Sequence, residues 1–155
     1  MCLGYRGHMI KEYFLNYEAM NNDFTICLGR QNCITYQEDH KEQDFNVTLT
    51  ETGPDNMTGG RVKRVEKYID DRDNFMVRYG DGGADVDISK LVDFHKSHGK
   101  VATVTTVRPI SPFGILDVDN SGRMGEIVEK PQVDGWASVG YMILNRRIFD
   151  YLGGR

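Results

Sequence analysis

The stretch that decides the fold reads FMVRYGDG and covers residues 75–82. A run suited to a strand stops at Gly80, and the carboxylate of Asp81 follows at once between two glycines. In sheets flanked by helices, ligands bind just beyond the carboxyl ends of strands. Asp81 is therefore a candidate ligand for Mg²⁺, which prefers carboxylate and phosphate oxygens. Asp-Gly is also common turn chemistry, so a plain turn is the competing interpretation.

The segments on both sides of this stretch alternate between strand and helix patterns. Apolar residues at three- and four-residue spacing predict helices over 8–20 and 62–69, and Asp87 and Gly99 bracket a third. The expected strands are 2–3, 24–28 paired with 33–36, 45–49, 75–79, 101–107, 113–118 paired with 124–128, and 138–144, before a short helix over 145–152. This order predicts a single α/β domain over residues 1–155, with helices flanking a mixed sheet.

Composition excludes several classes of protein. The chain has 155 residues, a net charge of -4 and a pI of about 5.5, which argues against binding a nucleic-acid backbone. No window approaches the ~18 apolar residues of a membrane span, and the first residues do not resemble a secretory signal. Three sparse cysteines predict reduced thiols and a cytoplasmic protein, with Cys27 and Cys33 packing on a hairpin across which they could also meet.

A second candidate site lies at residues 58–61, which read TGGR. Backbone amides at the start of a helix bind anions, and glycine opens the approach. Thr58 and Gly60 would then lie at an anion site, and Arg61 could bind phosphate or ribose oxygens in a fork. The competing interpretation is a glycine loop that leads into a basic, solvated helix face.

A third candidate site is the sequence EKP at residues 129–131. The ammonium group of Lys130 is a compact charge suited to a sugar phosphate, while the alternative is a surface ion before a strand terminator. His95 and His98 share one helix face but show no metal-ligand pattern, so we expect solvated or capping roles for them.

Taken together and in order, these segments resemble the glucose-1-phosphate cytidylyltransferases, a branch of the sugar-phosphate nucleotidyltransferases. The resemblance covers nearly the whole chain. It is carried by GYRG at 4–7, IKEYF at 10–14, NVTL at 46–49, TG at 52–53, MTGGR at 57–61, YGDG at 79–82, DFH at 93–95, HGK at 98–100, FG at 113–114 and EKP at 129–131.

The resemblance implies a fold, a reaction and roles for individual residues. The fold would be the Rossmann-like, mixed sheet of the nucleotide-diphospho-sugar transferases. The reaction would join CTP and glucose 1-phosphate to give CDP-glucose and pyrophosphate, with Mg²⁺ as cofactor. Asp81 would hold the metal ion, and Lys130 would bind the sugar phosphate. The remaining substrate contacts would come from Thr58, Gly60, Arg61, Tyr79, Gly80, Glu129 and Gly140.

The chain also departs from the family's pattern. The family's first strand with its G-G-x-G-T-R loop, and its later metal-binding aspartate, have no counterpart here. Val139 stands where the family has a glycine close to the sugar. We therefore expect impaired or absent transfer by the isolated chain, and a homo-oligomer that pairs the exposed sheet edges. The alternative function is a non-catalytic oligomeric binding protein derived from a nucleotidyltransferase.

Overall fold

The computed structural model describes residues 1–155 except 30–32, 38–44, 71 and 154–155. The chain divides into two compact units, each described by itself below. The first unit comprises Met1–Asp70 with Phe149–Arg155, and the second comprises Asp71–Ile148. The single domain expected from the sequence stays a prediction.

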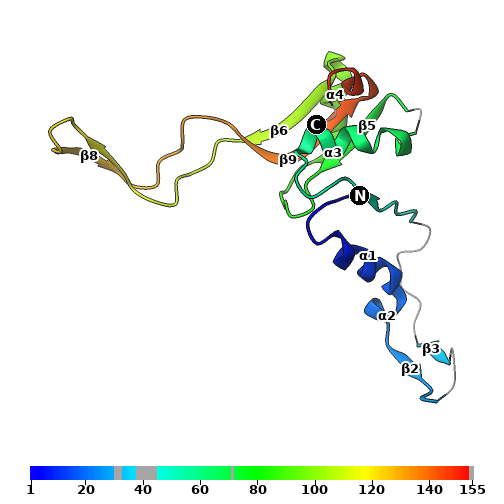
Figure 1. The fold of residues 1–155 in the computed structure, drawn as a ribbon. Helices are drawn as coiled ribbons and strands as arrows, with labels where there is room; N and C mark the ends of the chain where they lie inside the picture. Colours follow the sequence, from blue (N-terminus) through cyan, green and yellow to red (C-terminus); the bar gives the residue numbers. More distant parts are fainter. Residues whose placement is uncertain (30–32, 38–44, 71, 154–155) are drawn as a thin grey trace. The chain divides into compact units, whose positions relative to one another are not determined.

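The first unit combines short helices with two small sheets (Figure 1). Strand β1 pairs with β4 in parallel, and β2 pairs with β3 as an antiparallel hairpin. The elements are β1 Cys2–Leu3, α1 Gly7–Leu15, α2 Tyr17–Asn21, β2 Phe24–Ile26, β3 Ile34–Tyr36, β4 Thr50–Glu51, α3 Thr58–Arg64 and the 3-10 helix η1 Glu66–Tyr68.

Three predictions for the first unit are wrong in detail. The helix expected over 62–69 begins four residues earlier, as α3, and is interrupted at Val65 before the 3-10 helix η1. The helix expected over 8–20 is interrupted at Asn16, whose side-chain and backbone N–H groups donate to the Glu12 carbonyl at 2.8 and 3.0 Å and end α1. Residues 45–49 form no strand, and pairing begins only at Thr50. The partner strand explains this, because β1 offers two residues and Thr50 already pairs with the first.

The second unit is built on a three-stranded antiparallel sheet with the order β5-β9-β6. Its elements are β5 Asn74–Arg78, α4 Ile88–His98, β6 Ala102–Val107, β7 Ile115–Val118, β8 Met124–Val128 and β9 Ala137–Asn145. The 3-10 helix η2 Arg146–Asp150 follows, and its last two residues belong to the first unit. Asp87 caps α4 by accepting the Lys90 N–H at 3.0 Å, and Gly99 ends it in the left-handed conformation, as predicted. The predicted α/β class with both parallel and antiparallel pairs is confirmed.

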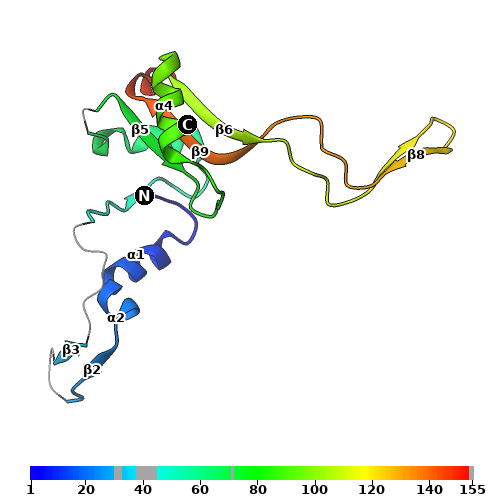
Figure 2. The ribbon, with the colours of Figure 1, turned by 180° about the vertical axis from the view of Figure 1, so that it is seen from behind.

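Strands β7 and β8 form an antiparallel ribbon, which we call the arm (residues 113–130). In Figures 1 and 2 two extended segments join the arm to the sheet, one leaving β6 and one entering β9. All four residues of β7 and all five of β8 are exposed. Within the second unit, no described residue outside the arm therefore covers either of its faces.

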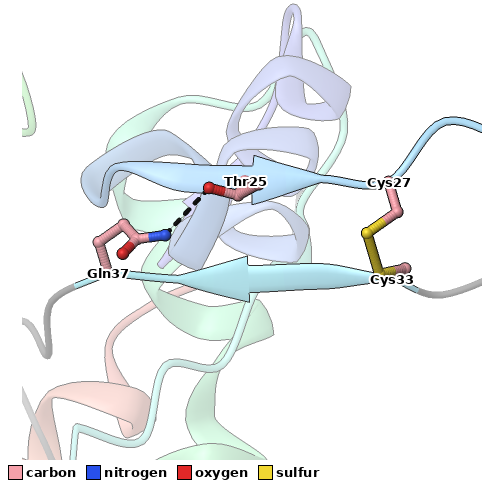
Figure 3. Close-up of a disulfide and its surroundings, with 4 residues drawn as sticks. All are labelled: Thr25, Cys27, Cys33 and Gln37. Carbon is pink, nitrogen blue, oxygen red and sulfur yellow. Dashed lines mark hydrogen bonds between the residues drawn. A yellow bond between two sulfur atoms is a disulfide. The ribbon is translucent and has the colours of Figure 1, made fainter.

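The hairpin of β2 and β3 ends in a disulfide between Cys27 and Cys33 (Figure 3). Their Cα atoms are 5.2 Å apart, a separation that a disulfide spans. The expectation of reduced thiols on this hairpin is therefore wrong for the pair, while burial raises the pKa of the free thiol of Cys2. Within the described residues, every helix is too short or too polar to cross a lipid bilayer.

Candidate functional site

The turn after β5 presents the carboxylate of Asp81. The Arg78 guanidinium donates to the Gly82 carbonyl through Nε at 3.2 Å and Nη2 at 2.7 Å. The Gly82 N–H donates to the Tyr79 carbonyl at 3.3 Å, which closes the turn. Asp81 is exposed, and its carboxylate has no hydrogen bond or ion pair to any described residue. The hydrogen-bonded turn thus exposes the Asp81 carboxylate to solvent, where it is available to a ligand.

Gly140 of β9 lies against this turn. The Tyr79 N–H donates to the Gly140 carbonyl at 3.1 Å, and a Cβ on Gly140 would lie only 2.8 Å from Tyr79 Cδ2. Gly140 also has a φ of 78°, which other residues rarely adopt. Of the predicted site residues, the structure brings Tyr79, Gly80, Asp81 and Gly140 together, with Gly140 shaped to receive the tyrosine ring.

Glu129 and Lys130 follow β8 at the base of the arm. Lys130 has a φ of 45°, an uncommon conformation for a residue with a side chain. Glu129 Oε2 lies 3.1 Å from the place of a Cβ on Gly114, so the glycine leaves room for this carboxylate. Within the described part of the second unit, no hydrogen bond or ion pair joins either residue to the Asp81 turn, so their convergence stays a prediction.

Thr58, Gly60 and Arg61 belong to α3 in the first unit. Thr58 is exposed at the first helical position, whereas Gly60 is buried. Arg61 is half-buried, and its guanidinium donates to four protein oxygens. These are Asn56 O at 2.8 Å, Leu3 O at 3.1 Å, Thr52 Oγ1 at 2.8 Å and Pro54 O at 3.0 Å. Four of the five guanidinium N–H groups are engaged within the protein, so Arg61 holds the chain together in this conformation.

Sequence reasoning missed the partners of Arg61. Thr52 is fully buried and donates its hydroxyl to the Leu3 carbonyl at 2.7 Å. A Cβ on Gly4 would lie 2.4 and 2.6 Å from the two terminal nitrogens of Arg61, so the guanidinium lies flat against this glycine. We call Leu3, Gly4, Thr52, Pro54, Asn56 and Arg61 the Arg61 hub. The signal was present in the GYRG and TG motifs, but nothing in one sequence pairs residues about 50 positions apart.

The sequence also gave no sign of a buried histidine network in the second unit. His95 is 3% exposed, with Nδ1 2.8 Å from Thr103 Oγ1 and Nε2 3.0 Å from Asn74 Oδ1. His98 accepts the Lys100 N–H at Nδ1, so its Nε2 donates to Thr103 Oγ1 at 2.8 Å. Burial, and then the charge of His98, lowers the pKa of His95. His95 is therefore a buried core residue whose environment favours the neutral form, where a solvated or capping role was expected.

No group of three or more acidic, histidine or cysteine side chains gathers as a metal site among the described residues. Asp81 alone can supply one carboxylate oxygen to a cation. The other ligands of a magnesium ion at this turn would be phosphate oxygens and water, which suits a metal that keeps several water ligands.

This chain is similar to known proteins over nearly its whole length. Residues 6–154 match the family model described as nucleotidyl transferase. Glucose-1-phosphate cytidylyltransferase of Salmonella typhimurium is 41% identical over 153 residues, or 98% of this chain and 58% of that protein. A probable glucose-1-phosphate cytidylyltransferase of Bacillus subtilis is 37% identical over 154 residues, with the same two coverages. The chain thus spans 58% of the length of these curated relatives.

The fold has a counterpart among solved structures. The crystal structure of HddC from Yersinia pseudotuberculosis matches 99% of this chain and 59% of that chain, with a TM-score of 0.52 at 22% identity. At this identity the match concerns the fold alone. The family model, however, covers nearly the whole sequence, and the resemblance read from the motifs is confirmed. The chain therefore belongs to the nucleotidyl transferase family.

Proposed function

We propose that this chain takes part in joining CTP and glucose 1-phosphate to give CDP-glucose and pyrophosphate. The observation that carries the proposal is the 41% identity with a glucose-1-phosphate cytidylyltransferase over 98% of the chain, which includes the Asp81 turn. The exposed and unpartnered carboxylate of that turn supports it, because a residue with no structural partner among the described residues is available for chemistry.

The reaction assigns distinct tasks to the second unit. In-line attack of the sugar phosphate on the α-phosphorus needs positioning and neutralisation of charge. Lys130 would neutralise and orient the sugar phosphate, with Glu129 accepting hydrogen bonds from sugar hydroxyls. Asp81 would hold the magnesium ion, which when bound neutralises the phosphate charge. Tyr79 and Gly140 would fix the backbone from which Asp81 projects, since they pack on each other.

The first unit would supply nucleotide contacts. We propose that Thr58 and the backbone at Gly60 meet the nucleotide directly, because the Arg61 guanidinium already binds four protein oxygens. One N–H group of Arg61, on Nη2, is still available to donate to a phosphate or ribose oxygen. Its main task would then be to fix residues 52–56 in front of α3.

Weak metal binding would limit turnover by this chain alone. With Asp81 as its one protein ligand, a magnesium ion would have mostly water and phosphate ligands. A single preorganised hydrogen-bond donor that stabilises charge in the transition state contributes about 10²–10³ in rate, so incomplete stabilisation of the phosphate charge slows transfer strongly. We therefore expect nucleotide binding with slow or absent transfer, in a protein that associates with copies of itself.

Substrate binding tests this proposal directly. Titration calorimetry measures the binding of CTP and of glucose 1-phosphate to the purified chain, with and without Mg²⁺. Weak CTP binding that depends on Mg²⁺ and is lost in Asp81→Asn is the expected result, with Asp85→Asn as the matched control. Absence of heat with every substrate would end the proposal.

A second function is a non-catalytic binding protein, and Val139 favours it. The backbone carbonyl oxygen of Val139 lies 3.5 Å from the place of a Cβ on Gly82, so the residue that replaces the family's glycine is beside the Asp81 turn. This function predicts a folded protein that binds nucleotide without turnover. Pyrophosphate release that is abolished in Asp81→Asn would exclude it.

A further inference from the structure

The turn that carries Asp81 has little in its own backbone to fix it. Gly80 and Gly82 flank the aspartate, and a Cβ on Gly80 would meet no atom within 4 Å. Glycine has more backbone freedom than any other residue, so two glycines around one carboxylate allow it many positions. The Gly82 N–H closes the turn on the Tyr79 carbonyl at 3.3 Å, a long distance for such a bond. A well-defined place for the Asp81 carboxylate therefore requires a restraint from a side chain.

The side chain of Arg78, the last residue of β5, supplies this restraint. Its Nε and Nη2 groups both donate to the Gly82 carbonyl, at 3.2 and 2.7 Å. Hydrogen bonds from a charged donor are stronger than those from a neutral one. Since the N–H of Gly82 also has a partner, both backbone polar groups of this glycine are engaged. Arg78 thus holds the residue that directly follows Asp81.

The guanidinium of Arg78 is itself held by an aromatic ring. Arg78 and Tyr141 stand directly opposite each other in the pair of β5 and β9, so their side chains project from the same face of the sheet. Arg78 Cζ lies 5.1 Å from the centroid of the Tyr141 ring, within the range of a cation–π contact. The ring limits the conformations of the arginine, so less freedom is lost when its planar fork binds the Gly82 carbonyl.

The side chain of Tyr79 restrains the same turn from the opposite face. Neighbouring residues of a strand point to opposite faces, so the Tyr79 ring lies across the sheet from the Arg78 guanidinium. The ring packs where Gly140 has no side chain, and the Gly140 N–H donates to Ser138 Oγ at 3.2 Å. The turn is therefore held by a tyrosine on one face and by an arginine on the other.

We propose that Arg78 is a positioning residue for the Asp81 carboxylate and that Tyr141 supports it in this role. The proposal rests on the proposed function, in which Asp81 holds the magnesium ion of the bound nucleotide. Residues that orient a metal ligand contribute about 10–100-fold to metal affinity. Arg78 acts through the backbone of Gly82, so its loss lets the glycine turn move and takes the carboxylate away from the metal. The competing role is structural, in which Arg78 stabilises the end of β5 and leaves metal binding unchanged.

Removal of the two donors separates these roles. Arg78→Met keeps an unbranched side chain over the Tyr141 ring and deletes both N–H groups that bind Gly82. Titration calorimetry with CTP at a series of Mg²⁺ concentrations gives the concentration needed for half-maximal binding. It should rise by about tenfold or more in Arg78→Met. Arg78→Lys keeps one charged donor and should lie between Arg78→Met and wild type.

Arg108→Met is the matched control. Arg108 also lies over an aromatic ring of the second unit, with Cζ 5.9 Å from the centroid of Trp136, but its guanidinium donates to Asp134 and not to the turn. Amide hydrogen exchange measured by NMR reads the turn without any ligand. The Gly82 amide should exchange faster in Arg78→Met than in wild type, and at the wild-type rate in Arg108→Met.

The two measurements give distinct outcomes. Faster exchange in Arg78→Met with an unchanged Mg²⁺ requirement would make Arg78 a structural residue and overturn the proposal. Unchanged exchange would overturn the route through Gly82. Failure of wild type to bind CTP with Mg²⁺ would end the proposed function itself, and the positioning role with it, before any variant is compared. If Arg78→Met does not fold by circular dichroism, Arg78→Lys carries the test, with a rise of about threefold or more expected from loss of the planar fork.

Discussion

The Arg61 hub and the arm use their residues in opposite ways. In the hub, Thr52 is fully buried and Arg61 donates four hydrogen bonds to protein oxygens. The polar groups of the hub therefore bind one another and leave little for a ligand. In the arm, Leu116 and Ile127 are 50% and 56% exposed. Polar motif residues can therefore be structural, while apolar residues can be the ones that remain available to a partner.

Loss of the Arg61 side chain should have the largest effect on stability. Arg61→Ala removes the donor to the Asn56 and Pro54 carbonyls and to the buried Thr52 hydroxyl, so we expect a loss of about 3 kcal/mol or more in the free energy of unfolding. Urea denaturation followed by circular dichroism measures it. Arg123→Ala in the arm is the matched control and should stay within about 0.5 kcal/mol of wild type. Equal, small losses in both would show that the hub does not stabilise the chain.

A methyl group on Gly4 should disturb the same hub more gently. In Gly4→Ala the new Cβ meets the Arg61 guanidinium at 2.4 Å, and four hydrogen bonds resist its displacement. We expect a loss of about 2 kcal/mol, as for an overpacked core. Gly83→Ala, which would meet no atom within 4 Å, is the control. Urea midpoints that coincide for the two variants would contradict the packing of Arg61 on Gly4.

Acid should weaken the second unit through His95. Its pKa is lowered in the folded state by burial and by His98, so the unfolded chain binds more protons below the ordinary histidine pKa of about 6.5. Stability should therefore fall as the pH drops below about 6.5, by at most about 1.4 kcal/mol per pH unit from this group. The slope should shrink in His95→Gln and persist in His8→Gln. A pH dependence that His95→Gln leaves unchanged would assign it to other groups.

A charge in the arm should have the smallest effect on folding. Leu116→Asp should change the free energy of unfolding of the monomer by less than about 0.5 kcal/mol, because the side chain already meets water. In contrast, Leu3→Ala should cost about 2–5 kcal/mol, since Leu3 is 1% exposed. Thermal unfolding at low protein concentration compares them. A large loss in Leu116→Asp would mean that the arm is covered within one copy.

The fold followed from the sequence wherever local chemistry decides it. Asp87 and Gly99 bracket α4 as predicted, and the alternating apolar residues locate the strands of the sheet. Prediction from the sequence failed where the bounds of an element depend on a partner far away in the chain. Strand β4 starts at Thr50 because its partner β1 has only two residues, and a local alternation pattern holds no information about that partner.

In the candidate site, too, local features were predicted from the sequence and long-range contacts were not. The Asp81 turn was predicted from a strand followed at once by Gly-Asp-Gly, a purely local pattern. The role of Gly140 in receiving the Tyr79 ring, and that of Arg61 in binding Leu3 and Thr52, depend on residues far apart in the chain. One sequence alone does not bring such residues together.

The most direct test of the central claim is the binding of CTP to the purified chain with and without Mg²⁺. Titration calorimetry on wild type, Asp81→Asn and Asp85→Asn should show heat that requires Mg²⁺, falls at least tenfold in Asp81→Asn and persists in Asp85→Asn. Binding of equal strength in all three proteins, or in the absence of Mg²⁺, would contradict the assignment of the Asp81 turn as the metal and nucleotide site.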